Sequence, residues 1–307
     1  MSPLWVALAA ATGLSVRTLP CPLGGGTVKV HEKLSENAAG GYDSDLARYS
    51  SGGQWRAVHV STCDGNLFSL YAEDMASPLS PERQRALVPV LEAAVARVAD
   101  RGSPTPWERY AIAAALYEAL GRDDVFLGDL WLEASWTARD LAVGYYPGLN
   151  GPVEARKLLD AGWQELKKPL ADADRRKVLH NLARVAHRGG WTEERDGYLG
   201  ALEALGGLDA EARATVERFR RATREIEPRL QDEAIARYRA ALTKADALPH
   251  DEKVRVSYLL ADLLRRRGRA REALPLFFLV ANDAKAEETL RGLALFLAGD
   301  LAAAAKH

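Results

Sequence analysis

The chain contains two thiols, and these are the first groups to consider for chemistry. They belong to Cys21 and Cys63, its only cysteines. Two thiols are too few for a structural zinc site with four cysteine ligands, but they suffice for one disulfide. From their number alone, the pair could be a disulfide, two free thiols or two ligands of a metal completed by other donors.

A pair of acidic residues, Asp43 and Asp45, stands in a loop rich in glycine and serine. In an extended segment, alternate side chains point to the same face, so both carboxylates would lie on one side. Such a pair suggests calcium binding or acid–base catalysis. Aspartates in loops of this composition more often accept hydrogen bonds from backbone N–H groups of a turn. We therefore expect a structural role for both residues.

Two histidines, His180 and His187, are seven positions apart on one expected helix and so lie nearly on one face. Arg184 and Arg188 are close to them in sequence, and positive charge disfavours a bound cation. The chain also lacks the phosphate-binding loop, the nucleophile elbow, the zinc-protease motif and the dinucleotide fingerprint. We therefore predict no catalytic, cofactor-binding or metal-binding residues.

Arginines gather in two runs near the C-terminal end. The first is Arg218, Arg220, Arg221 and Arg224, and the second is Arg265, Arg266, Arg267, Arg269 and Arg271. Glutamates at helical spacing around the first run, and a helix C-terminus at the second, favour solvated helix surface. The alternative is a groove that holds an acidic peptide or a carboxylate terminus. On that alternative, the partner-binding candidates are Arg265, Arg266, Arg269, Tyr145 and Tyr146.

Overall charge gives no reason to expect nucleic acid or an anionic membrane as a partner. The 307 residues include 41 basic and 42 acidic side chains, for a net charge of −1. Apolar residues make up 48% of the chain, which is enough for a packed core.

The first residues have the pattern of an export signal. Residues 1–16 have no charged side chain, and Leu4–Leu14 is an apolar run too short to span a bilayer. We expect residues 1–17 to be a signal peptide and the protein to reach the periplasm or cell envelope, although no basic residue precedes the run. The alternative is an irregular or buried N-terminus in a cytoplasmic protein.

Three short motifs resemble one uncharacterised bacterial family. They are CPLGG at 21–25, GYDSDLARY at 41–49 and TCDGN at 62–66. In these positions the sequence resembles the N-terminal module of the family called domain of unknown function 2225. That family typically shows Cys-Pro-x-Cys-Gly, then Gly-x-Asp-x-Asp, then a second Cys-x-x-Cys, followed by helical repeats. The resemblance implies a zinc-ribbon-like module with a helical tail.

The sequence departs from that family at two decisive positions. Gly24 and Asn66 stand where each motif would have its second cysteine, so four cysteine ligands are not available. The resemblance implies that Cys21 and Cys63 lie close together, and a disulfide between them is the favoured outcome. A disulfide requires an oxidising compartment, which agrees with an export signal. His31 and His59 could serve as substitute metal ligands, but solvated strand histidines are the simpler interpretation.

Composition divides the chain into a small β module at 18–75, a Pro-rich linker at 76–81 and a helical region at 82–307. Glycine-rich turns and the alternation in 27–31 and 55–61 predict strands in the first part. Ser80 before Pro81 marks the start of the first long helix. A capping box begins at Thr105, and a glycine stop at Gly121 ends the helix that follows it.

The clearest helical signal is Val256–Ala281. Leucines occur at helical spacing before Gly268, and Ala273, Phe277 and Ala281 follow it on one face. This resembles a tetratricopeptide repeat, in which one helix pair must stack on neighbours to bury its apolar face. Tyr198 lies as far after Gly189 as Phe277 lies after Gly268. We expect four or five helical hairpins and a closing helix over 284–305.

The sequence thus predicts a mainly α protein, with a small N-terminal β ribbon followed by a tetratricopeptide-like solenoid. The function we expect is that of a non-enzymatic, exported envelope scaffold that binds a protein partner through the groove of the solenoid. The alternative is a cytoplasmic regulatory or nucleic-acid-associated module with a degenerate zinc ribbon. A third hypothesis is an enzyme that uses Asp43 and Asp45 or the loop of Tyr145 and Tyr146.

Overall fold

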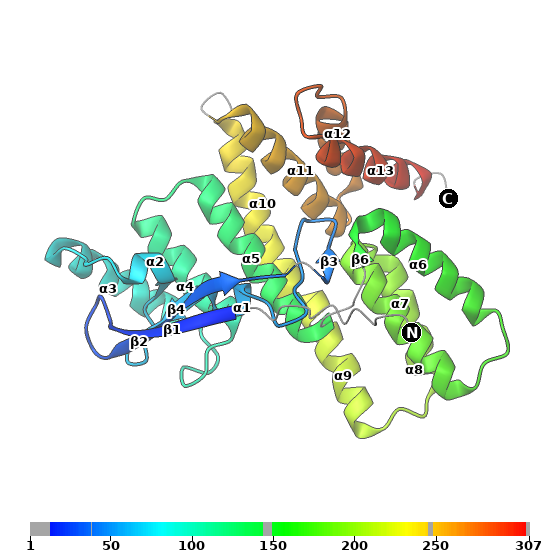
Figure 1. Ribbon diagram of the computed structural model, residues 1–307, viewed down its shortest axis with the longest axis horizontal. Coiled ribbons are helices and arrows are strands. Elements are labelled where there is room, and N and C mark those ends of the chain that lie inside the picture. The colour runs from blue at the N-terminus through cyan, green and yellow to red at the C-terminus, as the bar shows by residue number, and fades with distance from the viewer. Residues whose placement is uncertain (1–12, 38, 144–148, 245–247, 305–307) are drawn as a thin grey trace, which may run out of the picture. The chain divides into compact units, whose positions relative to one another are not determined.

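The computed structural model describes residues 13–37, 39–143, 149–244 and 248–304 (Figure 1). Its fold is mainly helical, with a few short strands near the N-terminus, as predicted. Backbone contacts divide the chain into two compact units. We call Met1–Gly41 with Arg48–Gly121 the N-terminal unit, and Tyr42–Ala47 with Arg122–His307 the helical unit.

This division differs from the boundary expected at 76–81. The linker and the two long helices after it group with the strands, while the six residues Tyr42–Ala47 group with the helices. Most of the expected signal peptide, residues 1–12, lies outside the described residues. Residues 13–17 form part of strand β1 (Gly13–Pro20).

The N-terminal unit contains two small antiparallel ribbons. Strand β1 pairs with β2 (Thr27–Ser35), and β4 (Val60–Thr62) pairs with β5 (Ser69–Tyr71). The alternation predicted at 27–31 is confirmed, since Val28 and Val30 are fully buried. The strand expected over 55–61 is only partly right, because a short helix, α1 (Arg56–His59), precedes β4.

The ribbons are joined by a disulfide between Cys21 and Cys63, whose Cα atoms are 5.7 Å apart. Gly24 and Asn66, the residues that stand in place of the missing cysteines, are also in contact. The Nδ2 group of Asn66 donates to the carbonyl of Gly24 at 3.1 Å, and its Oδ1 accepts from the backbone N–H of Phe68 at 3.0 Å. The two turns are therefore held together by a covalent bond and by a hydrogen bond next to it.

Three helices complete the N-terminal unit: α2 (Ala72–Met75), α3 (Pro81–Val95) and α4 (Pro106–Ala119). Both predicted helix starts are confirmed. The Ser80 side chain accepts from the N–H of Arg83, and Thr105 and Glu108 form the capping box. Gly121, with φ +81°, follows the end of α4 as expected.

The helical unit is built from helices that pack mostly on their neighbours in sequence. They are α5 (Asp124–Val143), α6 (Gly151–Leu166), α7 (Asp172–Gly189), α8 (Thr192–Leu205), α9 (Ala210–Arg221), α10 (Glu227–Thr243), α11 (His250–Arg266), α12 (Ala270–Ala281) and α13 (Glu288–Ala304). Two-residue strands β3 (Gly41–Tyr42) and β6 (Leu149–Asn150) pair with each other. The exception is α5, which packs on α10, a helix distant from it in sequence.

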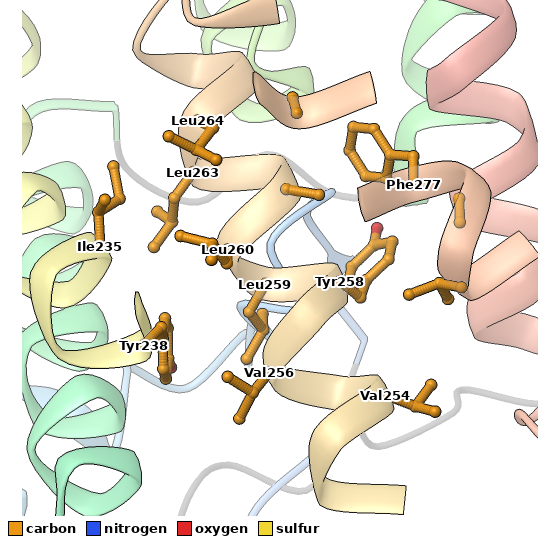
Figure 2. Packing of buried hydrophobic residues seen from close by; sticks show 14 of the residues in the cluster. Ile235, Tyr238, Val254, Val256, Tyr258, Leu259, Leu260, Leu263, Leu264 and Phe277 are labelled. Carbon is orange, nitrogen blue, oxygen red and sulfur yellow. The ribbon is translucent and has the colours of Figure 1, made fainter. Parts of the chain in front are cut away.

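The helix pair predicted around Gly268 is confirmed and forms the centre of the main core. Gly268 has φ +71° between α11 and α12. Leu259, Leu260, Leu263 and Leu264 are all buried, as is Phe277. Figure 2 shows α11 between Ile235 and Tyr238 of α10 on one side and Phe277 of α12 on the other. The continuation of such pairs as a tetratricopeptide-like solenoid stays a prediction.

A π-helix, η1 (Ala222–Ile226), joins α9 to α10. A break in the helix is expected near Pro228, because proline lacks the N–H that an α-helix needs at that point. The break takes the form of a widened turn, in which the N–H of Glu227 donates to the carbonyl of Ala222. Such turns occur often at functional sites.

Removal of the disulfide is expected to destabilise the N-terminal unit. Cys21 and Cys63 are 42 positions apart, and loop-closure entropy alone makes such a bond worth about 4 kcal/mol. We expect Cys21→Ser/Cys63→Ser to lower the urea midpoint of this unit, and dithiothreitol to do the same only in the wild type. The measurement is urea unfolding followed by circular dichroism. Equal midpoints for oxidised and reduced wild type would contradict the expectation.

Candidate functional site

The loop Tyr42–Ala47 places three polar side chains inside the helical unit. Asp43, Ser44 and Asp45 are each 1% exposed or less. A tight turn sets their directions: the N–H of Asp43 donates to the carbonyl of Ala47 at 2.9 Å, and Leu46 has φ +67°. A positive φ at leucine is uncommon and is kept only where the surroundings enforce it. The loop is therefore held by contacts outside itself.

The main contact is Arg139 of α5, whose side chain is fully buried. Its guanidinium binds three carboxylates: Nη1 lies 2.8 Å from Asp43 Oδ2, Nη2 lies 2.6 Å from Asp45 Oδ2, and Nη2 also lies 2.6 Å from Glu227 Oε1. On its other oxygen, Asp43 accepts from Nε of Arg188 on α7 at 2.5 Å. One loop, α5, α7 and α10 thus meet at these charged groups.

A second set of contacts comes from α11. Asp262 accepts from Nε of Arg265 at 2.9 Å and from Nε of Arg266 at 2.8 Å. Ser44 Oγ donates to Asp262 Oδ2 at 3.0 Å and accepts from both arginines. The hydroxyl of Tyr258 donates to the backbone carbonyl of Ser44 at 2.6 Å. The loop is thereby tied to the same helix that centres the hydrophobic core.

The same two arginines cap the C-terminus of α7. Arg265 donates to the carbonyls of Gly189 and Gly190, at 2.7 and 3.1 Å. Arg266 donates to those of His187 and Arg188, at 3.1 and 2.7 Å. The last carbonyls of a helix have no partner within it and have partial negative charge, so two buried guanidinium groups stabilise this end.

We call the buried residues of these two sets the charge network. It has four carboxylates, those of Asp43, Asp45, Glu227 and Asp262, and four guanidinium groups, those of Arg139, Arg188, Arg265 and Arg266. The charges therefore balance. Burial of charge is costly, and the loss of one partner leaves an uncompensated charge that costs roughly 3–5 kcal/mol. The network is stable only when it is complete.

The arginines keep two carboxylates of the network, those of Asp45 and Glu227, ionised. Burial by itself would raise the pKa of Asp45, but Arg139 and Arg266 hold it far below its ordinary value. Burial also opposes ionisation of Glu227, but the charge of Arg139 and the hydrogen bond from His187 lower its pKa to about 2.

His187 lies at the edge of the network and is uncharged. Burial lowers its pKa, and Arg195 and Arg139 act in the same direction against the opposing effect of Glu227. Its Nε2 is 2.7 Å from Glu227 Oε2, and its Nδ1 is 3.2 Å from Nη1 of Arg195. An arginine can only donate, so Nδ1 is the acceptor and the proton is assigned to Nε2.

The network reaches a pocket of about 290 Å³ in the helical unit. Glu227 and Arg266 of the network line it, together with His187, Arg195, Arg224 and Arg267. The pocket borders η1, which supplies Thr223 and Arg224. We call it the arginine pocket. Its lining is mostly polar and cationic, so it suits a small anionic group better than an apolar ligand.

The partner-binding residues proposed from the sequence are only partly at the surface. Arg265 and Arg266 are not on the surface: they are 6% and 4% exposed and belong to the network. Arg269 is at the surface, where it pairs with Glu272 at 2.7 Å. Tyr145 and Tyr146 lie outside the described residues.

Asp43 and Asp45 both reach Arg139, so they share one side of their loop, and the carboxylates of both bind guanidinium groups. Sequence analysis missed their main partner, Arg139. The one signal was Asp262, a charged residue inside the apolar run 259–264. Such an interruption indicates a buried partner, although it does not say which one.

No group of three or more potential metal ligands occurs among the described residues, and no described helix is both long and apolar enough to cross a membrane. Comparison of the chain with protein-family models, curated protein sequences and solved structures found no match.

Acid is expected to destabilise the helical unit through Glu227. Its pKa is lower in the folded protein than the ordinary 4.5, so the unfolded chain binds more protons and stability falls as pH falls from about 5 to 2. Glu227 accounts for roughly 3 kcal/mol of this loss. We expect Glu227→Gln to be less stable at pH 7 and to lose less stability in acid. Urea unfolding at a series of pH values measures both effects.

The control is Glu211→Gln, at an exposed glutamate of α9, which should leave the pH profile unchanged. If Glu227→Gln and wild type lost stability in parallel below pH 5, Glu227 would not be held ionised in the way described.

A methyl group at Gly190 is expected to disturb the network. Gly190 and Gly268 both have positive φ, so alanine costs about 1 kcal/mol at either. At Gly190 a Cβ would also lie 2.3 Å from Nη2 of Arg265, whereas at Gly268 nothing lies within 4 Å. We expect Gly190→Ala to cost at least about 2 kcal/mol more than Gly268→Ala in urea unfolding, because Arg265 must leave its partners. Equal losses would show that Arg265 adapts freely.

Proposed function

We propose that this chain is a non-enzymatic binding protein of an oxidising compartment, exported to the cell envelope, and that its helical unit holds a protein partner. The observation that carries the proposal is the charge network. Its acidic and basic groups bind one another and hold the loop Tyr42–Ala47, α5, α7, α10 and α11 together, and two of them, Glu227 and Arg266, line a polar pocket. Groups held in this way serve to fix a binding surface rather than to transfer protons.

Rigidity of the pocket favours binding. A ligand that meets side chains already held in place loses less conformational entropy than one that must order them. His187, Glu227 and Arg266 each have buried partners that fix their orientation. The pocket wall is therefore preorganised by the same contacts that stabilise the fold.

The disulfide supports export. A bond between Cys21 and Cys63 persists in the periplasm or outside the cell and is reduced in most cytosols. The expected signal peptide at 1–17 and the resemblance to a bacterial family with a zinc-ribbon-like module agree with this location. In the competing proposal, a cytoplasmic regulatory module, both thiols would be reduced.

Fractionation of the native host tests the proposal. We expect the protein in the periplasmic or envelope fraction, with its thiols oxidised, and we expect reduction to slow its mobility on a non-reducing gel. Cross-linking in intact cells should then join the oxidised form to a second protein. A cytoplasmic protein with two titratable thiols, or an exported protein that forms no cross-linked complex, would contradict the proposal.

Only the exposed arginines of the second run, 265–271, are suitable for substitution in a test of partner binding. Arg265 and Arg266 are buried, so their replacement would unfold the protein rather than probe a surface. Arg269→Gln is suitable, since this residue pairs only with the exposed Glu272 among the described residues.

A further inference from the structure

The two arginine runs of the sequence meet at the arginine pocket. Arg224 of the first run and Arg266 and Arg267 of the second line it, and Arg195 of α8 is added by the fold. We infer that this pocket is a binding site for a carboxylate group. The inference rests on the proposed binding function and assigns the chemistry of the group that is bound.

Most charges around the pocket are neutralised by protein groups. Arg266 is bound to Asp262, and Arg267 is bound through two nitrogens to Asp232, at 2.9 and 3.1 Å. Glu227 is bound to Arg139. None of these residues leaves an uncompensated charge in the pocket.

Arg195 and Arg224 are different, because they share a single carboxylate. Nε of Arg195 lies 2.8 Å from Oδ1 of Asp196, and Nη2 of Arg224 lies 3.3 Å from the same oxygen. Two guanidinium groups against one carboxylate leave one positive charge. The adjacent His187 is neutral and adds no charge of its own. One bound monoanion would complete the balance.

Arg195 is already held in place for such a ligand. Its side chain is 4% exposed, and Nη1 donates to Nδ1 of His187 at 3.2 Å. Its Nη2 has no hydrogen-bond partner among the described residues. This nitrogen is accessible to solvent rather than buried, so an oxygen of a ligand in the pocket can accept a hydrogen bond from it. Arg224 also lines the pocket and is 45% exposed, so its side chain can contact the ligand as well.

The ligand class follows from charge and shape. The planar fork of a guanidinium matches the two oxygens of a carboxylate. A single uncompensated charge suits a monoanion, and Asp196 would repel a dianion such as phosphate. The volume of about 290 Å³ admits a small acid or the end of a peptide, but not a whole helix. The carboxylate can therefore come from a free acid or from the C-terminus of a partner.

Calorimetric titration of the full chain at low ionic strength tests this inference. The probes are acetate, acetyl-Ala-Ala-Ala with a free C-terminal carboxylate, the same peptide as an amide, and inorganic phosphate. We expect one saturable site for a carboxylate probe, no binding of the amide and weaker binding of phosphate. Binding of acetate as tightly as the peptide indicates a free acid, and tighter binding of the peptide indicates a partner's C-terminus.

Matched variants locate the site. We expect Arg224→Gln to weaken binding by about fivefold or more. Arg221→Gln removes the same charge from an exposed arginine that does not line the pocket, and it should change affinity less than about twofold. Asp196→Asn removes the competing carboxylate and should strengthen binding by about fivefold. A gain of affinity cannot arise from unfolding.

The inference is overturned if no carboxylate probe saturates, if the amide binds as well as the acid, or if phosphate binds more tightly than either carboxylate. It is also overturned if Arg221→Gln and Arg224→Gln weaken binding equally, which would indicate general surface charge. Failure in these titrations leaves the exported, oxidised protein and its cross-linked partner untouched. Conversely, a cytoplasmic protein that binds carboxylate would refute the proposed function alone.

Discussion

Arg139 sets the constraint on which the helical unit depends. Its buried guanidinium binds Asp43 and Asp45 of the loop and Glu227 of α10 at 2.6–2.8 Å. A charge buried in this way is tolerated only with its full set of partners, so neither the loop nor α10 can shift without a large loss of free energy. Six residues that precede most of the N-terminal unit in sequence thereby belong to the helical one. Their placement follows from charge compensation rather than from hydrophobic pattern.

The same physics connects the fold to the arginine pocket. Helix α11 contributes its leucines to the main core (Figure 2). Its two arginines donate to the carbonyls at the end of α7. His187 of α7 and Arg266 of α11 form part of the pocket wall. The π-helical turn η1 contributes Arg224 to the same wall. The packing of the core, the capping of α7 and the geometry of the pocket therefore all depend on the position of α11. A change in one is transmitted to the others through the buried ion pairs.

The N-terminal unit is stabilised by different means. Its strands are short, and the bond between Cys21 and Cys63 joins the two turns. The hydrogen bond between Asn66 and Gly24 lies beside it, at the positions where the resembled family has its other two cysteines. A covalent bond and an amide contact can hold two turns in place without a metal ion. Small β modules with limited cores commonly require such cross-links.

The sequence by itself determined the local structure. Helical periodicity and an αL glycine fixed the pair around Gly268, and Ser80 and Thr105 fixed two helix starts, because these signals act between residues within one or two turns. Only the tertiary structure determined which residues come together at the site. Asp43 and Arg139 are 96 positions apart, and no periodic pattern connects them. Arg265 and Arg266 have the composition of exposed surface, and they are buried only because distant carboxylates and the carbonyl groups of another helix replace the water that their charges would otherwise need.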